Sequence, residues 1–190
     1  NLTAGAKYNM ILEFYERGGS ATAKLLWKTP GATTFAPVPA NRLYVATNVA
    51  QGKTSKQSST SNGGVAGRAV DGNTNGTYSA NSVTHTGSNA NAWWQVDLGS
   101  NYAINSIVLW NRTDCCANRL TNFYVFVSTS DISGRSYSSL VNDTTVWRYR
   151  VTGQAPTKLH IPANVNGRFV RVQLAGTNYL SLAEVQVWAR

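Results

Sequence analysis

The chain contains a series of segments that are rich in β-branched and aromatic residues and separated by Gly, Asn, Asp and Ser. In "RFVRVQL", Val170, Val172 and Leu174 alternate with Arg171 and Gln173, which predicts a strand with one buried and one exposed face. We find no sequence with the period of an amphipathic helix. The sequence therefore predicts an all-β fold, a sandwich or jelly roll. The expected strands are "WWQVDL" (93–98), "AINSIVLWNR" (103–112), "TNFYVFVS" (121–128), "TVWRYRV" (145–151), "KLHI" (158–161), "RFVRVQL" (168–174) and "AEVQVW" (183–188).

The first 44 residues have a different pattern. "KYNMILEFYERGGSATAKLLWK" predicts a β-hairpin that turns at "ERGGS" and ends its second strand at Trp27. The Pro-rich stretch that follows, "TPGATTFAPVPANRLY", predicts a loop or linker. A single hairpin is only marginally stable in water. We therefore expect residues 1–44 to be an extension that packs against something else.

The composition favours a binding protein over an enzyme. Hydrophobic residues make up 42% of the chain and charged residues only 13%, which suits a secreted β-protein with a polar surface. A glycosidase normally needs two positioned carboxylates, and the 8 acidic residues are scarce. The 2 histidines and 2 adjacent cysteines support neither a Cys/His zinc cage nor a Cys–His nucleophile.

Charge and hydropathy exclude two further classes. The net charge of +9 comes from scattered Lys and Arg with few acids, without the cluster or basic helix expected of a nucleic-acid-binding protein. No apolar run reaches the roughly 18 residues of a membrane span. The chain begins at Asn1 without a signal-peptide pattern, so it reads as a processed product or a segment of a longer protein.

The spacing of the strands predicts a site. If "GSNY" (99–102) is the turn of a hairpin over residues 93–112, the loop before Trp93 and the loop after Trp110 meet at one end of the sheet. His85 would then lie close to Arg112 and Arg119. Each of these residues alone has an ordinary explanation, a solvated loop His or an Arg that caps a loop. Together they form an electropositive, donor-rich site suited to a polyol, a carboxylate or a phosphate.

The segment "RTDCCANR" holds both cysteines of the chain, Cys115 and Cys116. Adjacent Cα atoms lie about 3.8 Å apart, below the usual disulfide range of about 4.4–6.8 Å. A bond between them would close a small rigid ring that adds little loop-closure entropy but fixes the loop. It would also offer a flat sulfur surface to the C–H face of a sugar. The alternative is a pair of free or intermolecular thiols.

From about Val49 to Trp188 the sequence resembles the F-type lectins, the fucose-binding branch of the discoidin-like jelly rolls. The resemblance rests on several motifs in the expected order: "AVDGNTNGTYSANSVTH" (69–85), "AWWQVDLG" (92–99), "NRTDCCANR" (111–119) and "GRFVRVQL…LSLAEVQVW" (167–188). The sugar motif of the family is a His, then Arg-Gly-Asp-Cys-Cys, then a second Arg, and the spacings here fit. Thr113 stands where Gly is usual, which bears on the loop backbone because Gly tolerates positive φ and Thr does not.

The resemblance implies roles for these residues. His85, Arg112 and Arg119 would hydrogen-bond the ring oxygen and the 3- and 4-hydroxyls of α-L-fucose. The Cys115–Cys116 disulfide would stack against the sugar, and Tyr78 would help to seat its methyl group. The implied partners are fucosylated glycans of the blood-group type.

A calcium ion is a further expectation. Asp71, Asn73 and Ser82 lie in one Gly/Asn-rich turn region, and Glu184 opens the last strand; oxygen ligands of this kind suit Ca²⁺. The alternative is an Asx-turn with a buried Glu–Arg pair. In F-type lectins these positions hold a structural calcium, which the backbone carbonyls at Arg68 and Ala183 would complete.

Residues 1–44 resemble the C-terminal end of the protective-antigen-type β-domain, and residues 45–190 would form the lectin domain. The resemblance implies a larger, modular, secreted bacterial protein. We expect residues 1–44 to pack on the lectin domain or on a second copy, which would give a homo-oligomer, away from the sugar loops. The rival reading is a discoidin domain that binds phospholipid or a protein, but its loops should carry exposed apolar residues, and "TSKQSSTSNGG" and "HTGSNANA" are polar.

Overall fold

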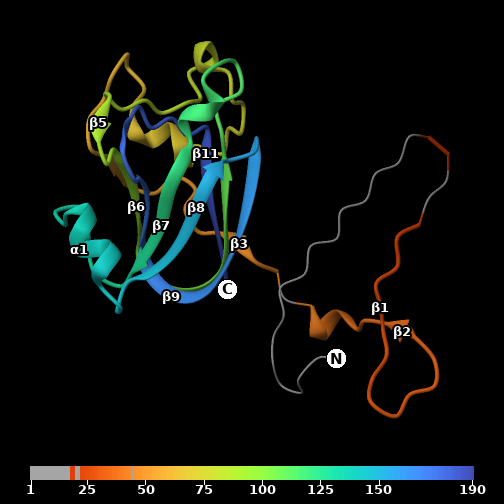
Figure 1. Ribbon diagram of the computed structural model, residues 1–190. Helices are drawn as coiled ribbons and strands as arrows, with labels where there is room; N and C mark the ends of the chain where they lie inside the picture. Colours follow the sequence, from red (N-terminus) through yellow and green to blue (C-terminus); the bar gives the residue numbers. More distant parts are fainter. Residues whose placement is uncertain (1–17, 20–21, 44) are drawn as a thin grey trace. The chain divides into compact units, whose positions relative to one another are not determined.

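The computed structural model describes residues 18–19, 22–43 and 45–190 (Figure 1). The chain divides into two compact units, Asn1–Val45 and Ala46–Arg190. Among the described residues, no helix has the length and apolarity that crossing a bilayer would require.

The described part of the small unit contains one short strand pair. β1 (Leu26–Trp27) pairs antiparallel with β2 (Ala36–Pro37), and the 3₁₀-helix η1 (Ala40–Arg42) follows. The predicted first strand of the hairpin, with Tyr8, Met10, Leu12 and Phe14, lies outside the described residues. The Pro-rich stretch, which the sequence predicts as a loop or linker, contributes the two-residue partner of Leu26–Trp27.

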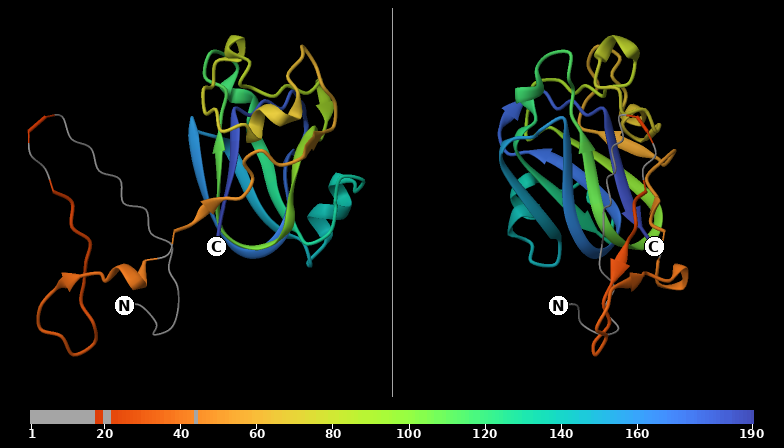
Figure 2. Two further views of the ribbon diagram at one scale, coloured as in Figure 1. Left: turned by 180° about the vertical axis from the view of Figure 1, so that it is seen from behind. Right: turned by 90° about the vertical axis from the view of Figure 1, so that its right-hand side faces the viewer.

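Two long bent strands build the large unit. β6 (Trp93–Trp110) and β9 (Lys158–Leu174) pair antiparallel along their lengths, and both curve at the bottom of the view in Figure 1. Each strand therefore contributes one half to each of two facing layers, which Figure 2 shows from behind and from the side. The structure is an all-β sandwich, as predicted.

The remaining strands extend these two layers. The first layer contains β4 (Ser55–Gln57), the first half of β6, the second half of β9, β7 (Thr121–Ser128) and the edge strand β8 (Trp147–Gln154). The second layer contains the first half of β9, the second half of β6, β11 (Glu184–Ala189) and β3 (Thr47–Asn48). A separate short pair joins β5 (Asn89–Ala90) to β10 (Thr177–Asn178).

The predicted hairpin over residues 93–112 is wrong, but the inference drawn from it, that the two flanking loops meet at one end of the sheet, is correct. The register shifts between Asp97, opposite Phe169, and Tyr102, opposite Gly167, so "GSNY" is a bend that β6 shares with β9. The two halves of β6 pair with β9 instead of with each other. The bend still returns the end of β6 to the end of the sandwich where β6 begins (Figure 1). The loops before Trp93 and after Trp110 therefore meet at one end, called here the loop end.

The core lies between the layers. Its largest fully buried side chain is Trp94, whose indole N–H donates to the Ala66 carbonyl at 2.9 Å. The aliphatic residues around it are buried as well, and each contributes about 1.5–3 kcal/mol of hydrophobic stabilisation. They include Val96, Leu98, Ile107, Leu109, Val170, Val172, Val185 and Val187.

One face of the first layer differs from the prediction. Arg171 and Gln173 are 1% and 2% exposed, so this part of β9 is not half-buried. A smaller cluster of Phe126, Ile132, Leu140 and Val146 brings the connection between β7 and β8 over this face. That connection contains the short helix α1 (Tyr137–Asn142), and its Ile132 carbonyl accepts from Arg171 Nη1 at 2.6 Å. The sequence did not reveal α1, because a helix of 6 residues is too short for an amphipathic period.

The ends of the large unit lie opposite the loop end. β11 begins with Glu184 beside Trp110 and finishes with Ala189 beside Ile104, close to the bend. Thr47 of β3 pairs with Ala189. The large unit therefore receives the chain at the bend, away from the loop end.

Candidate functional site

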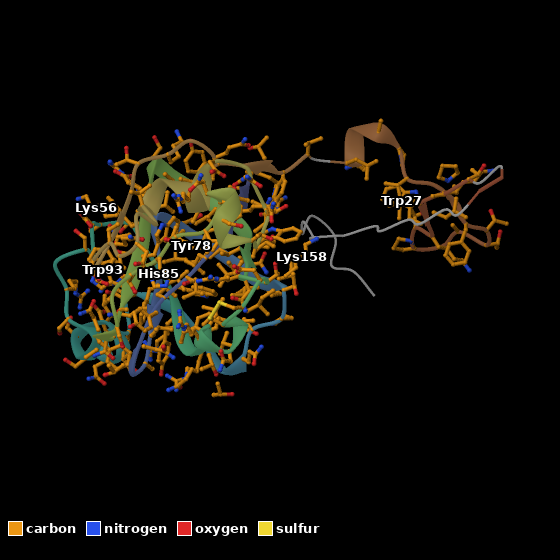
Figure 3. The ribbon with its side chains drawn as sticks, turned by 90° about the horizontal axis from the view of Figure 1, so that it is seen from above. Trp27, Lys56, Tyr78, His85, Trp93 and Lys158 are labelled. Atoms are coloured by element: carbon orange, nitrogen blue, oxygen red, sulfur yellow. A yellow bond between two sulfur atoms is a disulfide. The ribbon has the colours of Figure 1, made fainter. Side chains whose placement is uncertain are left out.

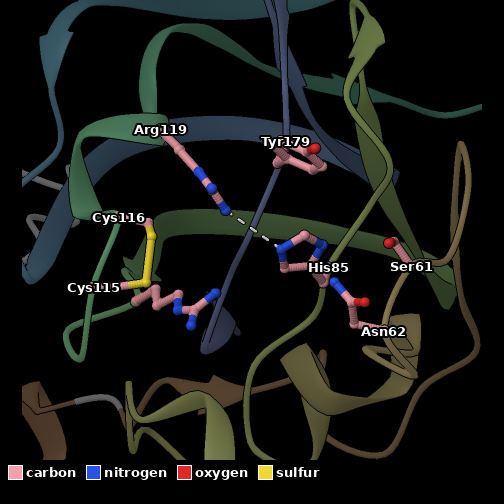
Figure 4. A pocket seen from close by; sticks show the side chains of 8 residues that line it. Ser61, Asn62, His85, Cys115, Cys116, Arg119 and Tyr179 are labelled. Atoms are coloured by element: carbon pink, nitrogen blue, oxygen red, sulfur yellow. Dashed lines mark hydrogen bonds between the residues drawn. A yellow bond between two sulfur atoms is a disulfide. The ribbon is translucent and has the colours of Figure 1, made fainter.

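The loop end carries a shallow pocket of about 460 Å³ (Figure 4). It combines the loop after β4, the segment before β5, the loop between β6 and β7, and the segment between β10 and β11. Its lining is polar apart from a disulfide and one aromatic ring. The lining residues are Ser61, Asn62, His85, Arg112, Cys115, Cys116, Arg119 and Tyr179.

His85 forms the back wall and is only 4% exposed. Its backbone N–H donates to the Gly64 carbonyl at 2.9 Å, and its carbonyl accepts from Ser61 N–H at 2.9 Å. The backbone of Gly64 passes so close that an added Cβ would lie 2.6 Å from His85 Cβ. Any larger residue at position 64 would displace the imidazole, so the glycine sets its place.

Arg112 is held by an acid of its own loop. Its Nε and Nη2 donate to the two carboxylate oxygens of Asp114 at 2.7 and 3.1 Å. This paired hydrogen bond from Arg112 lowers the pKa of Asp114 to about 2. The guanidinium carbon also lies 4.7 Å from the centroid of the Tyr78 ring. Asp114 thus orients Arg112.

Asn111 fixes the base of the same loop and was missed by the sequence reasoning. The side chain is 2% exposed. Its Nδ2 donates to the carbonyls of Ala117 at 3.0 Å and Ala155 at 3.2 Å, and its Oδ1 accepts from Arg112 N–H at 2.8 Å. Only the three-dimensional closure of the loop reveals this clamp.

A disulfide joins Cys115 to Cys116, with Cα atoms 3.8 Å apart. Cys116 is left-handed, with φ of 60°, and the turn η4 (Ala117–Arg119) starts directly after it. Thr113 is not among the residues with positive φ, so its replacement of the usual Gly causes no such strain. The Thr113 side chain packs closely against the backbone of Gly76. A Cβ added at Gly76 would lie 2.5 Å from Thr113 Oγ1, so a larger residue at position 76 would clash with Thr113.

Arg119 closes the pocket between two rings. Its Nη1 lies 3.4 Å from His85 Nε2 (Figure 4), and its guanidinium carbon lies 4.5 Å from the centroid of Tyr179. The Tyr179 and His85 ring centroids are 5.2 Å apart. The three predicted donors, His85, Arg112 and Arg119, therefore line one pocket. Tyr179 was not predicted, because it comes from a distant loop without a motif.

Tyr78 lies behind the lining. Its hydroxyl donates to the Asn62 carbonyl at 2.5 Å, and its ring meets His85 edge to face at 5.7 Å between centroids. Figure 3 looks onto the loop end, where Tyr78 and His85 lie beside each other. Tyr78 thus braces the first loop and the imidazole, and its predicted contact with a sugar methyl stays a prediction.

A second polar cluster lies at the start of β11. Glu184 is fully buried; its Oε1 accepts from Gly72 N–H at 3.2 Å. Its Oε2 is buried without a hydrogen-bond partner in the part of the chain that the structure describes. Burial and, second, the charge of Asp71 raise the pKa of Glu184 to about 7. An unpartnered buried carboxylate oxygen next to a second carboxylate is what a bound cation would relieve.

The other expected metal ligands surround this acid. Asp71 and Asn73 form consecutive Asx-turns, accepting from Asn73 N–H at 2.7 Å and Asn75 N–H at 3.1 Å. Ser82 Oγ donates to the carbonyls of Asn75 and Thr77. The Asx-turn of the alternative reading is present.

The Glu–Arg pair of that reading is not found among the described residues. Arg68 donates instead to the Val83 carbonyl at 3.1 Å and to Asn81 Oδ1 at 3.0 Å. Within the same residues, no three His, Cys, Asp or Glu side chains gather into a metal-binding group. Any metal here would need amide, hydroxyl and backbone oxygens beside Asp71 and Glu184, and such ligands fit calcium better than a transition metal.

The sandwich and its loop-end pocket define a galactose-binding-like module. The family described as "NedA-like, galactose-binding domain" matches residues 68–172. Fucolectin-1 of Anguilla japonica is 32% identical over 87% of this chain and 94% of its own length. The chain belongs to the F-type lectin, or fucolectin, family. This membership confirms that it is a carbohydrate-binding protein and not an enzyme.

Solved structures agree. A fucose binding module of Streptococcus pneumoniae is 34% identical, with a TM-score of 0.66 over 76% of this chain and 98% of that one. The lectin domain of lectinolysin, complexed with Lewis B antigen, is 39% identical, with a TM-score of 0.66 over 76% and 97%. A serum f-lectin of Morone saxatilis is 35% identical, with a TM-score of 0.67 over 77% of this chain and 50% of that one.

Proposed function

We propose that the loop-end pocket binds terminal α-L-fucose of fucosylated glycans through His85, Arg112 and Arg119. The observation that carries the proposal is the convergence of these three side chains with the Cys115–Cys116 disulfide in one pocket. Relatives described as a fucose binding module and as a lectin domain complexed with Lewis B antigen support the choice of sugar. The disulfide would take the C–H face of the ring, and the polar side chains would take its hydroxyls.

Calorimetric titration with methyl α-L-fucoside, followed by a glycan array at two salt concentrations, tests this proposal. A neutral sugar should bind with weak salt dependence, whereas a nucleic acid would show a steep one. Replacing Arg119 by Ala should abolish most of the binding. Arg148 is the matched control, because it is an exposed arginine of β8 outside the pocket. Equal binding by wild type and Arg119→Ala would contradict the proposal.

The rival function, binding of phospholipid or a protein as in other discoidin-like domains, has less support. Exposed apolar side chains at the loop end would be needed to enter a membrane. Val65 is one, at 53% exposure, but the pocket beside it is polar. Anionic vesicles that bind the protein irrespective of added fucoside would favour the rival.

We propose that a structural calcium ion occupies the corner of Asp71, Asn73, Ser82 and Glu184, with the carbonyls of Arg68 and Ala183. The unpartnered Glu184 Oε2 and its raised pKa support this assignment. The positive charge of the ion would balance the two neighbouring carboxylates of Asp71 and Glu184. It would tie the turn at Asp71 to β11 without touching the sugar.

An extracellular location suits a lectin of this kind, and one relative is described as a serum protein. For residues 1–44 we propose packing on the large unit or, in preference, self-association. Their described part exposes Leu26 by 45%, Phe35 by 67% and Leu43 by 48%. Deleting them should leave the affinity for fucoside unchanged while altering the apparent size in solution. A bacterial, modular parent stays a prediction.

A further inference from the structure

The turn over residues 61–64 carries an Asn-Gly pair into the lining of the pocket (Figure 4). The Gly64 N–H donates to the Ser61 carbonyl at 3.0 Å, which closes a four-residue β-turn. Both central residues are left-handed, with φ of 51° at Asn62 and 72° at Gly63. This is the backbone of a type I′ turn, which Asn followed by Gly adopts most readily. The conformation of the turn therefore explains why this pair stands here.

The same turn supports His85. The Ser61 N–H donates to the His85 carbonyl, and the His85 N–H donates to the Gly64 carbonyl, each at 2.9 Å. The Asn62 carbonyl accepts from the Tyr78 hydroxyl, and the Tyr78 ring contacts the imidazole edge to face. A change in the length or the charge of the turn would thus reach the back wall of the pocket.

The Asn-Gly pair of this turn is open to a reaction with itself. The backbone nitrogen that follows an Asn can attack the side-chain amide carbon, and Gly has no Cβ to hinder the approach. Asn62 and Gly63 are both exposed. Within the part of the chain that the structure describes, neither the Asn62 side chain nor the Gly63 N–H has a hydrogen-bond partner. Nothing in the fold therefore holds the two reacting groups apart.

The other two Asn-Gly pairs of the chain are more enclosed. In one, Gly76 is buried, and Asn75 Oδ1 accepts from the Thr77 N–H at 3.0 Å. The other, Asn166 with Gly167, lies inside β9, and its glycine is buried. Of these three described pairs, the one in the pocket alone has an exposed glycine.

We propose that Asn62 is a modification site at which the protein deamidates without an enzyme. The Gly63 nitrogen forms a bond to Cγ of Asn62, and the bond from Cγ to Nδ2 breaks. The proton of the Gly63 N–H passes through solvent to the leaving nitrogen, which departs as ammonia. Water then opens the five-membered imide. Cleavage at Cγ gives aspartate, and cleavage at the main-chain carbonyl gives isoaspartate, whose backbone is longer by one methylene.

Either product should weaken binding in the pocket. Aspartate brings a carboxylate into a lining that contains Arg112 and Arg119, and a guanidinium would bind it in place of a neutral ligand. Isoaspartate lengthens the turn whose two ends pair with His85. The modification itself follows from the turn alone, whereas the loss of affinity rests on the proposed function.

Peptide mapping by mass spectrometry tests the modification. The full chain is incubated at mildly alkaline pH, where the Gly63 nitrogen loses its proton more readily, and a second sample is incubated in denaturant. In the folded protein the amide of Asn62 should be lost well before those of Asn75 and Asn166. In the unfolded sample the three should react at comparable rates. An Asn62 amide that persists in the folded protein, or equal loss at all three positions there, would overturn the proposal.

Calorimetric titration with methyl α-L-fucoside before and after incubation tests the consequence. The fraction of fully active sites should fall as Asn62 is converted. The variant Asn62→Asp, which has the charge without the longer backbone, should bind severalfold more weakly than the fresh protein. Asn166→Asp is the matched control, because it adds the same charge opposite Ala103, near the bend. Unchanged binding by a fully converted sample would overturn the consequence. If the fresh protein does not bind the fucoside, the proposed function fails, and the peptide map still decides the modification.

Discussion

The pocket that His85 and Arg119 line and the corner that Asp71 and Glu184 form both lie at the loop end, yet their charges are opposite. The pocket gathers two guanidinium groups, and of these two only Arg112 is paired with an acid among the described residues. The corner holds two carboxylates, and Glu184 has neither a cation nor a second hydrogen bond for Oε2 among the described residues. The pocket is partly open, whereas Glu184 is fully buried.

The two sites differ in how their polar groups are exposed. Donors with free hydrogen-bonding capacity at an open pocket suit a ligand that binds reversibly. A buried acceptor without a hydrogen-bond partner suits a permanently bound ion, because burying it alone would cost free energy. Changes in the pocket should therefore alter sugar affinity and leave the fold intact, and changes in the corner should do the reverse.

Arg119→Ala should give the largest loss of affinity. It removes a guanidinium that faces both His85 and Tyr179. Losing a hydrogen bond to a charged group costs about 1.5–3 kcal/mol, which is roughly tenfold to a hundredfold in affinity. Calorimetric titration with methyl α-L-fucoside measures it, and thermal unfolding should be nearly unchanged. An Arg119→Lys protein that binds as well as wild type would show that charge alone suffices.

Acidification should give the second largest loss of affinity for the fucoside. The pKa of His85 is lowered in the folded protein, so the ring is neutral at neutral pH and becomes protonated as the pH falls through that lowered value. Protonation removes the acceptor at Nε2 and adds a cation beside Arg112 and Arg119. Affinity should then fall by at most about tenfold per pH unit. A titration series from neutral to acid pH checks this, and affinity that rises on acidification would contradict it.

Reducing the disulfide should have a smaller effect, a loss of affinity of several-fold. The bond closes a minimal ring, so its contribution to unfolding free energy is small, but it supports the loop between Arg112 and Arg119. Intact mass spectrometry confirms the oxidation state, and titration and thermal unfolding are followed before and after reduction. A fully active protein with two free thiols would refute the role of the disulfide.

Removing calcium should change affinity least and stability most. Chelation should lower the melting temperature, with about 2–4 °C lost per kcal/mol for a domain of this size. Glu184→Gln removes the unpartnered charge, and its melting temperature should be insensitive to calcium. Fucoside affinity should persist in the chelated protein while it stays folded. If the melting temperature of the wild-type protein does not change when calcium is added or chelated, the proposed calcium site is contradicted.

The sequence predicted some elements closely and others not at all. β7 matches the expected strand Thr121–Ser128, because its β-branched and aromatic residues favour a strand whatever the rest of the fold. The bend at Gly99–Tyr102 was mistaken for a hairpin turn, since turn residues do not show which strand lies alongside. Burial of Arg171 depends on the β7–β8 connection folding over it, which no local pattern shows.

The candidate site divides in the same way. His85, Arg112, Arg119 and the two cysteines were predicted because their motif is compact and their loops meet. Tyr179 and Asn111 were not, because their contacts join segments that are far apart in sequence. The acid corner was predicted from the family resemblance, and the structure adds that Glu184 Oε2 is unpartnered among the described residues.

A crystal structure of the protein with a fucosylated oligosaccharide and calcium tests the central claim most directly. The account predicts the terminal fucose in the loop-end pocket, with a hydroxyl on His85 Nε2, hydrogen bonds from Arg112 and Arg119, and a C–H face against Cys115–Cys116. It predicts the ion in the separate corner beside Asp71 and Glu184. Fucose bound on another surface, with the pocket left to solvent, would contradict the account.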